Sequence, residues 1–157
     1  MKSIFIYETK IGRIAIAEEN NAITEVLFYN EEKEINCQKN LKETHLIKEG
    51  YNQIQEYLSG KRKIFNLPLA LKGTEFQLKV WNALKTIPYG ETRSYKDIAI
   101  LINREKAARA VGMANNRNPI SIIIPCHRVI GSNGKLVGYG GGLNIKEYLL
   151  KLETSLH

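Results

Sequence analysis

The residue types best suited to covalent chemistry stand side by side, where Cys126, His127 and Arg128 follow Pro125. A cysteine attacks carbon only as its thiolate, and a free thiol with a pKa of about 8.5 is mostly protonated at neutral pH. His127 is a candidate base, and Arg128 is a source of positive potential. Because neighbours in an extended segment point to opposite faces, we expect a water to link Cys126 to His127. The base also needs an orienting acceptor, and the carboxylate of Glu153 in the last helix is available.

The alternative is that Cys126 is a small buried hydrophobic side chain beside a hydrogen-bonded histidine. Cys37 lies in a polar stretch without such neighbours and is predicted to be incidental. His45 and His157 are far from either cysteine in the sequence, which gives no metal-ligand spacing. We therefore expect no zinc site and no cofactor. Two cysteines are too few for a disulfide framework, which predicts free thiols in a reducing compartment.

Helices are predicted ahead of this segment. Thr74-Glu75-Phe76-Gln77 has the pattern of a capping box and begins a helix that ends at Ile87-Pro88-Tyr89-Gly90. Ser94-Tyr95-Lys96-Asp97 has a similar pattern and begins a second helix, which breaks at Asn103. A third helix runs to about Asn115. Two short helices joined tightly indicate a helix-turn-helix, a motif that often binds DNA but has other uses.

The chain then turns at Asn118-Pro119 and continues as the almost wholly apolar residues 120–124, which are predicted to form a buried strand leading to Cys126. Six of the twelve glycines lie between Gly131 and Gly142. This glycine-rich loop either lets backbone approach a ligand closely or is a plain turn. A last helix is expected to follow, with an inward face of Ile145, Leu149 and Leu152.

The first half of the chain is predicted to be a small α+β unit without a cluster of catalytic residue types. Short segments rich in β-branched and aromatic residues predict an antiparallel sheet with strands at residues 3–9, 12–17 and 23–29. An amphipathic helix follows and stops near Gly60. Its inward face is Ile47, Tyr51, Ile54 and Leu58. Residues 65–71 alternate as in a strand, and Pro68 confines that strand to an edge.

Positive charge is concentrated in the second half of the chain. Residues 1–71 hold 10 Lys and Arg against 10 Asp and Glu, whereas residues 72–157 hold 13 against 6, a net charge of +7. Such a field is either an ordinary solvated surface or a site for a polyanion such as the phosphate backbone of a nucleic acid. Since the 157 residues contain no signal-length or membrane-spanning apolar run, we expect a soluble, cytoplasmic protein of one domain or two small ones.

Several motifs together resemble one family. Residues Pro125-Cys126-His127-Arg128-Val129 are similar to the active-site signature of the O6-alkylguanine-DNA alkyltransferases, or methylated-DNA–protein-cysteine methyltransferases. Further motifs stand in the family's order and with family-like spacing: Ile87-Pro88-Tyr89-Gly90-Glu91-Thr92, Ser94-Tyr95, Ala108-Arg109-Ala110-Val111-Gly112, Asn118-Pro119 and the glycine-rich loop. The resemblance covers roughly residues 74–153.

The resemblance implies a catalytic role for five residues. Cys126 matches the nucleophile, which takes the alkyl group by direct displacement and is not regenerated. His127 matches the water-linked base, and Glu153 matches the carboxylate that orients it. Asn118 matches the side chain that braces the hinge before the active-site turn. Tyr95 matches the hydroxyl that helps to rotate the target nucleotide and stabilises the departing guanine.

The resemblance also implies how the DNA is held. Arg109 matches the finger that enters the base stack once the target nucleotide has been flipped out, and its small-residue helix would lie in the minor groove. The implied DNA-binding residues are Arg109, Ala108, Ala110, Gly112 and Arg128. The implied guanine pocket is lined by Val129, Tyr139 and Gly140. Gly140 and Asn115 stand where several relatives carry other pocket residues, which leaves the tolerance of bulky groups such as benzyl open.

The implied fold is α+β, with a ribonuclease-H-like α/β domain at residues 1–71 and a mainly helical domain at residues 72–157 that contains a winged-helix or helix-turn-helix motif. The first domain matches only loosely, and the metal-ligand positions of some relatives are not evident there. The implied function is DNA repair: a monomer without cofactor or metal transfers a methyl or alkyl group, once and irreversibly, from O6-alkylguanine in double-stranded DNA to Cys126. Activity on O4-alkylthymine stays open.

Three other functions compete with this one. A non-catalytic lesion-binding relative would flip the base and recruit other factors, but such proteins typically replace the acceptor cysteine, so Cys126 argues against it. A cysteine hydrolase would turn over repeatedly and need no DNA. A helix-turn-helix regulator would bind specific duplex sequences even without Cys126.

Overall fold

The computed structural model describes residues 2–29 and 41–155, so the positions of Cys37 and His157 lie outside it. The chain divides into two compact units. The first contains Met1–Leu71 together with Pro119–Ile123, and the second contains Lys72–Asn118 and Ile124–His157. Each unit has its own packed interior, and each is described by itself below.

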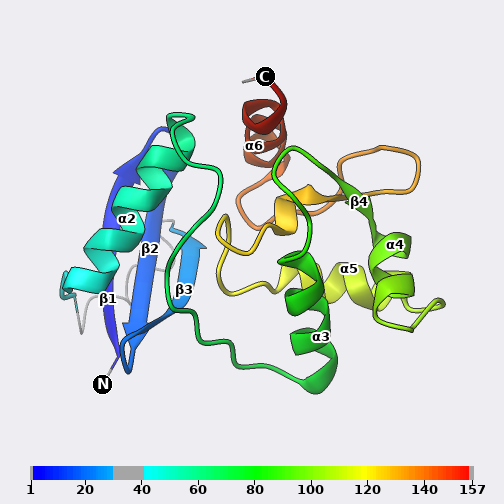
Figure 1. Cartoon of the computed structure of the whole chain (residues 1–157), viewed down its shortest axis with the longest axis horizontal. Coiled ribbons are helices and arrows are strands. Elements are labelled where there is room, and N and C mark those ends of the chain that lie inside the picture. Colours follow the sequence, from blue (N-terminus) through cyan, green and yellow to red (C-terminus); the bar gives the residue numbers. More distant parts are fainter. Residues whose placement is uncertain (1, 30–40, 156–157) are drawn as a thin grey trace. The chain divides into compact units, whose positions relative to one another are not determined.

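The first unit is a three-stranded antiparallel sheet with a helix on one face (Figure 1). Its strands are β1 (Ser3–Thr9), β2 (Gly12–Glu19) and β3 (Ala22–Phe28), which confirms the three predicted antiparallel strands. Strand β2 is in the centre. Asn20 and Asn21 join β2 to β3 with φ angles of 52° and 63°, the left-handed conformation that a tight two-residue hairpin requires. Helix α2 (His45–Leu58) buries Ile47 and Ile54, and Gly60 follows its end with φ +82°, which confirms the predicted stop.

The strand predicted at residues 65–71 is wrong. Only Leu69 pairs with the sheet, as a single bridge to Ile23 in β3. Pro68 has no N–H to donate, and the side chain of Gln53 instead holds the backbone of Asn66 through two hydrogen bonds of 2.9 and 3.1 Å. A buried glutamine therefore anchors this segment in place of a strand ladder.

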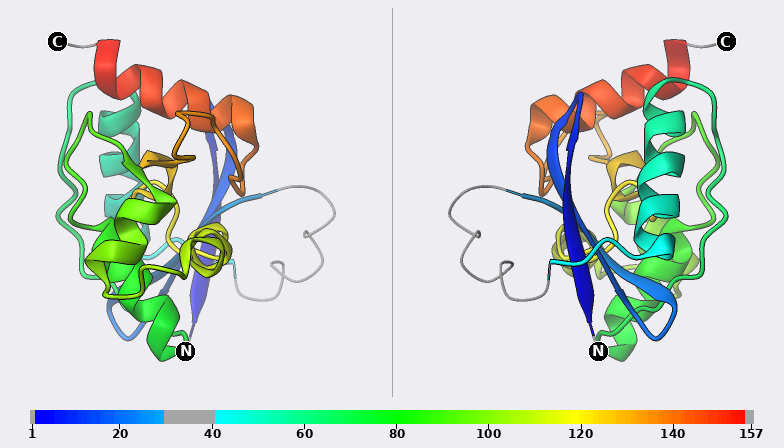
Figure 2. Two further views of the ribbon diagram at one scale, coloured as in Figure 1. Left: turned by 90° about the vertical axis from the view of Figure 1, so that its right-hand side faces the viewer. Right: turned by 90° about the vertical axis from the view of Figure 1, so that its left-hand side faces the viewer.

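The second unit is mainly helical. In chain order it contains α3 (Glu75–Leu84), β4 (Arg93–Ser94), α4 (Tyr95–Leu101), α5 (Ala108–Asn116), the 3₁₀ turn η3 (Cys126–Arg128), β5 (Val129–Ile130) and α6 (Leu143–Ser155). Both predicted capping boxes are present, at the starts of α3 and α4. Helices α3, α4 and α5 pack together, while α6 lies at the other end of the unit (Figures 1 and 2).

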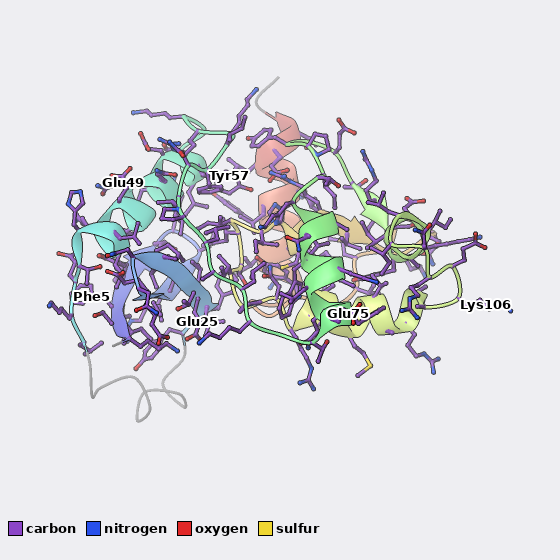
Figure 3. All side chains as sticks on the ribbon, turned by 60° about the horizontal axis from the view of Figure 1, so that its bottom comes forward. Phe5, Glu25, Glu49, Tyr57, Glu75 and Lys106 are labelled. Carbon is purple, nitrogen blue, oxygen red and sulfur yellow. The ribbon has the colours of Figure 1, made fainter. Side chains whose placement is uncertain are left out.

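A buried hydrogen bond fixes the packing of α3 against α5. The indole Nε1 of Trp81 donates to the backbone oxygen of Ala114 over 2.8 Å. Val80 and Leu84 of α3 and Val111 of α5 are fully buried beside it. The exposed side of the pair α4 and α5 mixes charged and apolar residues, among them Arg109, Leu101 and Met113, and Lys106 in the loop between the helices points outward (Figure 3). The predicted pair of short, tightly joined helices is confirmed.

The buried strand predicted at residues 120–124 is also wrong. Ile120 makes one bridge to Val26, and the chain then turns through residues 121–123, with Ile122 at φ +72°. The side-chain amide of Asn118 donates to the oxygen of Ile124 over 2.8 Å. This bond closes a turn, because in an extended segment the two residues would be too far apart to form it. An apolar run does not by itself distinguish a strand from a buried turn.

We expect the Ser94→Ala variant to lower the free energy of unfolding by about 1 kcal/mol. Ser94 is the N-cap of α4, its hydroxyl accepts the N–H of Asp97, and a helix of only 7 residues depends strongly on such a cap. Urea unfolding measures the change. Ser94→Thr keeps the hydroxyl and serves as the matched control, so an equal loss in both variants would contradict the assigned role of the cap.

Candidate active site

A short strand pair brings the start of α4 to the segment that carries the cysteine. Strands β4 and β5 are parallel, with Arg93 opposite Val129 and Ser94 opposite Ile130. Cys126 to Arg128 form the 3₁₀ turn η3, so the expectation of an extended segment there is wrong. Cys126 is 4% exposed, and His127 is completely buried. The thiol therefore lies inside the unit, close to the first residue of α4.

The carboxylate of Glu153 on α6 is the centre of a buried hydrogen-bond network. Oε2 accepts from Nε2 of His127 over 2.7 Å and from Nη2 of Arg128 over 3.0 Å. Oε1 accepts from Nε of Arg128 over 2.8 Å and from the backbone N–H of Gly90 over 3.0 Å. We call these four residues the Glu153 network. The predicted pairing of His127 with Glu153 is thus present, and Arg128 is an additional member.

His127 is neutral at neutral pH. Burial lowers the pKa of His127 below its usual value of 6.5. The hydrogen bond to Glu153 and the negative charge of Glu153 raise this pKa, and the positive charges of Arg128 and Lys146 lower it. The net shift is downward. With its Nε2 proton donated to Glu153, the neutral ring has a lone pair at Nδ1. This tautomer can accept a proton, as a general base must.

Lys146 is a functional candidate that the sequence analysis missed. Its side chain is 0% exposed, and its ammonium donates to the backbone oxygens of Val137 and Gly138 over 2.8 and 3.2 Å. Burial lowers the pKa of Lys146 to about 8, and the negative charge of the Cys126 thiolate partly opposes this shift. A signal was present in the sequence, since residues 146, 149 and 153 share one helical face, which puts the lysine on the same side of the helix as Glu153.

Tyr95 lies at the first position of α4, and its hydroxyl donates to the oxygen of Val137 over 2.8 Å. Burial raises the pKa of Tyr95, and the negative charge of Cys126 raises it further, which reflects how near the thiol is. Tyr95 and Lys146 thus both hold the glycine-rich loop at Val137. Gly138 in this loop has φ +60°, and a Cβ there would lie 2.8 Å from the amide of Asn116, so the loop's path requires glycine.

Two buried asparagines hold the backbone on either side of the cysteine. Asn118 donates to the oxygen of Ile124, and Asn115 donates to the oxygen of Cys126 over 3.3 Å. Asn118 therefore spans the turn before the cysteine, in agreement with a bracing role. Asn115, which the sequence analysis treated only as a variable pocket position, fixes the carbonyl of the cysteine itself.

The predicted pocket residues lie around η3. Val129 follows η3 directly and is completely buried. The ring of Tyr139 meets that of His127 edge-on, with centroids 6.5 Å apart. Gly140 is exposed, and a Cβ there would meet nothing within 4 Å, so this position has room for a side chain.

The predicted DNA-binding residues divide into two groups. Arg109 and Ala110 are exposed on α5. Gly112 instead faces α4, because a Cβ there would lie 3.7 Å from the ring of Tyr95, an ordinary van der Waals contact that a small side chain could make. The prediction that Arg128 binds DNA does not fit the structure. Arg128 is 7% exposed, and its guanidinium is committed to Glu153 and to the oxygen of Ile87.

A cavity of about 300 Å³ lies on a different side of Glu153 and is not the predicted guanine pocket. Ile130, Leu136 and Leu150 contribute to its lining, whereas Cys126, Val129 and Tyr139 do not. Among residues 2–29 and 41–155, no group of three or more His, Cys, Asp and Glu side chains is arranged to hold a metal ion. No helix in this part of the chain is both long and apolar enough to cross a membrane.

Two family models match the chain in sequence. Residues 5–71 match the model described as 6-O-methylguanine DNA methyltransferase, ribonuclease-like domain. Residues 75–155 match the model described as 6-O-methylguanine DNA methyltransferase, DNA binding domain. The predicted fold class, a ribonuclease-like first part followed by a mainly helical DNA-binding part, is confirmed.

Individual relatives extend this match over nearly the whole chain. The methylated-DNA–protein-cysteine methyltransferase of Methanosarcina acetivorans is 53% identical over 96% of this chain and 97% of its own length. The constitutive enzyme of that name from Bacillus subtilis is 50% identical over 93% of this chain and 92% of its own. The crystal structure of Mycobacterium tuberculosis OGT in complex with DNA superposes with a TM-score of 0.89 at 43% identity, covering 98% of this chain and 93% of that one. The chain therefore belongs to the methylated-DNA–protein-cysteine methyltransferase family.

Proposed function

We propose that this protein repairs DNA by moving the methyl or alkyl group from O6-alkylguanine to its own Cys126. The observation that carries the proposal is the pairing of a buried cysteine with a neutral histidine and its carboxylate, inside the part of the chain that matches a DNA-binding domain. We further propose that the protein acts as a monomer in the cytoplasm, with residues 1–71 and 72–157 as its two domains.

The proposed reaction is a displacement at the alkyl carbon. The thiol of Cys126 passes its proton through a water to His127, and the resulting thiolate attacks the carbon. A carbon–sulfur bond forms as the carbon–oxygen bond breaks, and the electron pair of the broken bond leaves with the guanine. No group in this scheme removes the alkyl group from sulfur, so each molecule acts once.

Two side chains are suited to stabilise the charges that develop. The ammonium of Lys146 is close enough to Cys126 to stabilise the thiolate, as the effect of Cys126 on the pKa of Lys146 indicates. The hydroxyl of Tyr95 donates to Val137 in the free protein and would exchange this acceptor for the departing guanine. Val129, Tyr139 and Gly140 would enclose the base.

The alkylated oxygen is out of reach inside a duplex, so the nucleotide must leave the base stack. We propose that α5 lies in the minor groove, where Ala108 and Ala110 allow close approach and Arg109 enters the stack. The basic charge of residues 72–157 would supply affinity that does not depend on sequence.

The first test is the mass of the intact protein after incubation with a duplex that contains one O6-methylguanine. We expect a gain of one methyl group per molecule, mapped to the peptide that contains Cys126, and no gain in the Cys126→Ser variant. Bound lesion DNA without any gain in mass would favour a lesion-sensing role. Release of product in excess of protein would favour a hydrolase.

The Arg109→Ala variant tests the proposed finger. We expect the rate of transfer from duplex DNA to fall by about tenfold or more, while transfer from the free base O6-benzylguanine changes little. Only in the duplex does a flipped nucleotide leave a place in the base stack that Arg109 would fill. Single-turnover kinetics with both substrates measure the two rates. Lys79→Ala, which removes an exposed positive charge from α3, is the control for general electrostatic attraction. Equal losses on both substrates would rule out the finger.

The pH dependence of transfer tests the proposed base. Since the pKa of His127 is lowered, the base stays available through neutral pH and is lost only as the pH falls through a value below 6.5. We expect the single-turnover rate to fall on the acid side at a pH below 6.5. In His127→Gln the rate should be low at every pH, without this acid limb. An acid limb centred above pH 7 in the wild-type protein would contradict a neutral His127.

A further inference from the structure

The Ile87–Gly90 turn holds both Arg128 and Glu153 of the Glu153 network. The oxygen of Ile87 accepts from Nη1 of Arg128 over 2.7 Å, and the N–H of Gly90 donates to Glu153 over 3.0 Å. The ring of Tyr89 lies under the guanidinium, whose central carbon is 5.7 Å from the ring centroid. This turn has no part in the proposed reaction, yet three of its residues contact Arg128 or Glu153.

Arg128 is held in one orientation by these contacts. It binds the carboxylate with two parallel hydrogen bonds, which is the strongest geometry available to an arginine and a carboxylate. Its third contact, to Ile87, prevents the guanidinium from turning away. The carboxylate of Glu153 is thereby aimed at Nε2 of His127 from a fixed position.

Arg128 also balances a buried negative charge. Glu153 is 1% exposed and His127 is completely buried, so a carboxylate beside a neutral imidazole would carry one uncompensated charge away from water. Such a pair would take up a proton to remove that charge. The guanidinium supplies the compensating charge and leaves the pair free of the extra proton.

We propose that Arg128 is a positioning residue for the alkyl transfer: locked by the Ile87–Gly90 turn, it fixes Glu153 and keeps the His127–Glu153 pair ready to accept the proton of Cys126. The role of Arg128 in alkyl transfer rests on the proposed function. Its effect on the reactivity of Cys126 can be tested without that function. Other charged and titratable groups near the pair are Lys146 from α6, Cys126 from η3, Tyr139 from the glycine-rich loop and Tyr89 from the Ile87–Gly90 turn. All of them are kept unchanged in the variants below.

The test compares Arg128→Gln with Arg128→Lys and the wild-type protein. Two quantities are followed against pH in the full chain: the rate at which iodoacetamide modifies Cys126, read by peptide mass spectrometry, and the single-turnover rate of methyl transfer. In Arg128→Gln the pair binds a proton at neutral pH, so we expect the midpoint of the acid limb to move up by about one unit or more in both assays. Arg128→Lys keeps the charge but loses the paired geometry, so its midpoint should stay near that of the wild type while the rate falls.

The control is Lys151→Gln, which removes a positive charge from the exposed surface of α6 and should leave both midpoints in place. An unchanged midpoint in Arg128→Gln, with only lower thermal stability, would show that Arg128 is structural and overturn the proposal. If Arg128→Gln does not fold, the double variant Arg128→Gln/Glu153→Gln removes both buried charges at once. Its acid limb should then lie no higher than that of the wild type, and a higher midpoint would likewise overturn the proposal.

The two assays separate the inference from the proposed function. If the wild-type protein transfers no methyl group, the proposed function fails, while iodoacetamide still reports the effect of Arg128 on Cys126. If transfer occurs but neither midpoint moves in Arg128→Gln, only the role of Arg128 fails.

Discussion

The second unit depends on the burial of one carboxylate. A carboxylate removed from water is costly unless its lone pairs find donors, and Glu153 on α6 meets this requirement with four donors from two other parts of the unit. The Ile87–Gly90 turn, η3 and α6 must therefore take their positions together. The same contacts orient His127. The hydrogen bonds that stabilise the buried carboxylate are therefore also the ones that hold the candidate base in place.

The charges around Cys126 are balanced within the unit. Arg128 offsets Glu153, and the ammonium of Lys146 is the remaining buried positive charge, held by two backbone oxygens of the glycine-rich loop. When the thiol ionises, its negative charge pairs with that ammonium. A neutral His127 beside these groups can take up the proton of the thiol without first having lost one.

Tyr95 connects the helix pair α4 and α5 to the segment that carries the cysteine. It begins α4, its ring packs against Gly112 of α5, and its hydroxyl reaches the glycine-rich loop. The parallel pair of β4 and β5 keeps this tyrosine beside η3.

The sequence by itself determined what local physics controls: the hairpin of the first unit, the two capping boxes and the inward Ile47, Ile54 and Leu58 of α2. It also predicted the pairing of His127 with Glu153. Only the tertiary structure decided that residues 120–124 turn back, that Arg128 is buried and that Lys146 faces the site. Hydrogen bonds within a turn or helix leave short repeating patterns in a sequence. The bond between Gly90 and Glu153 joins residues 63 positions apart, and such a pairing is fixed only when the whole unit packs.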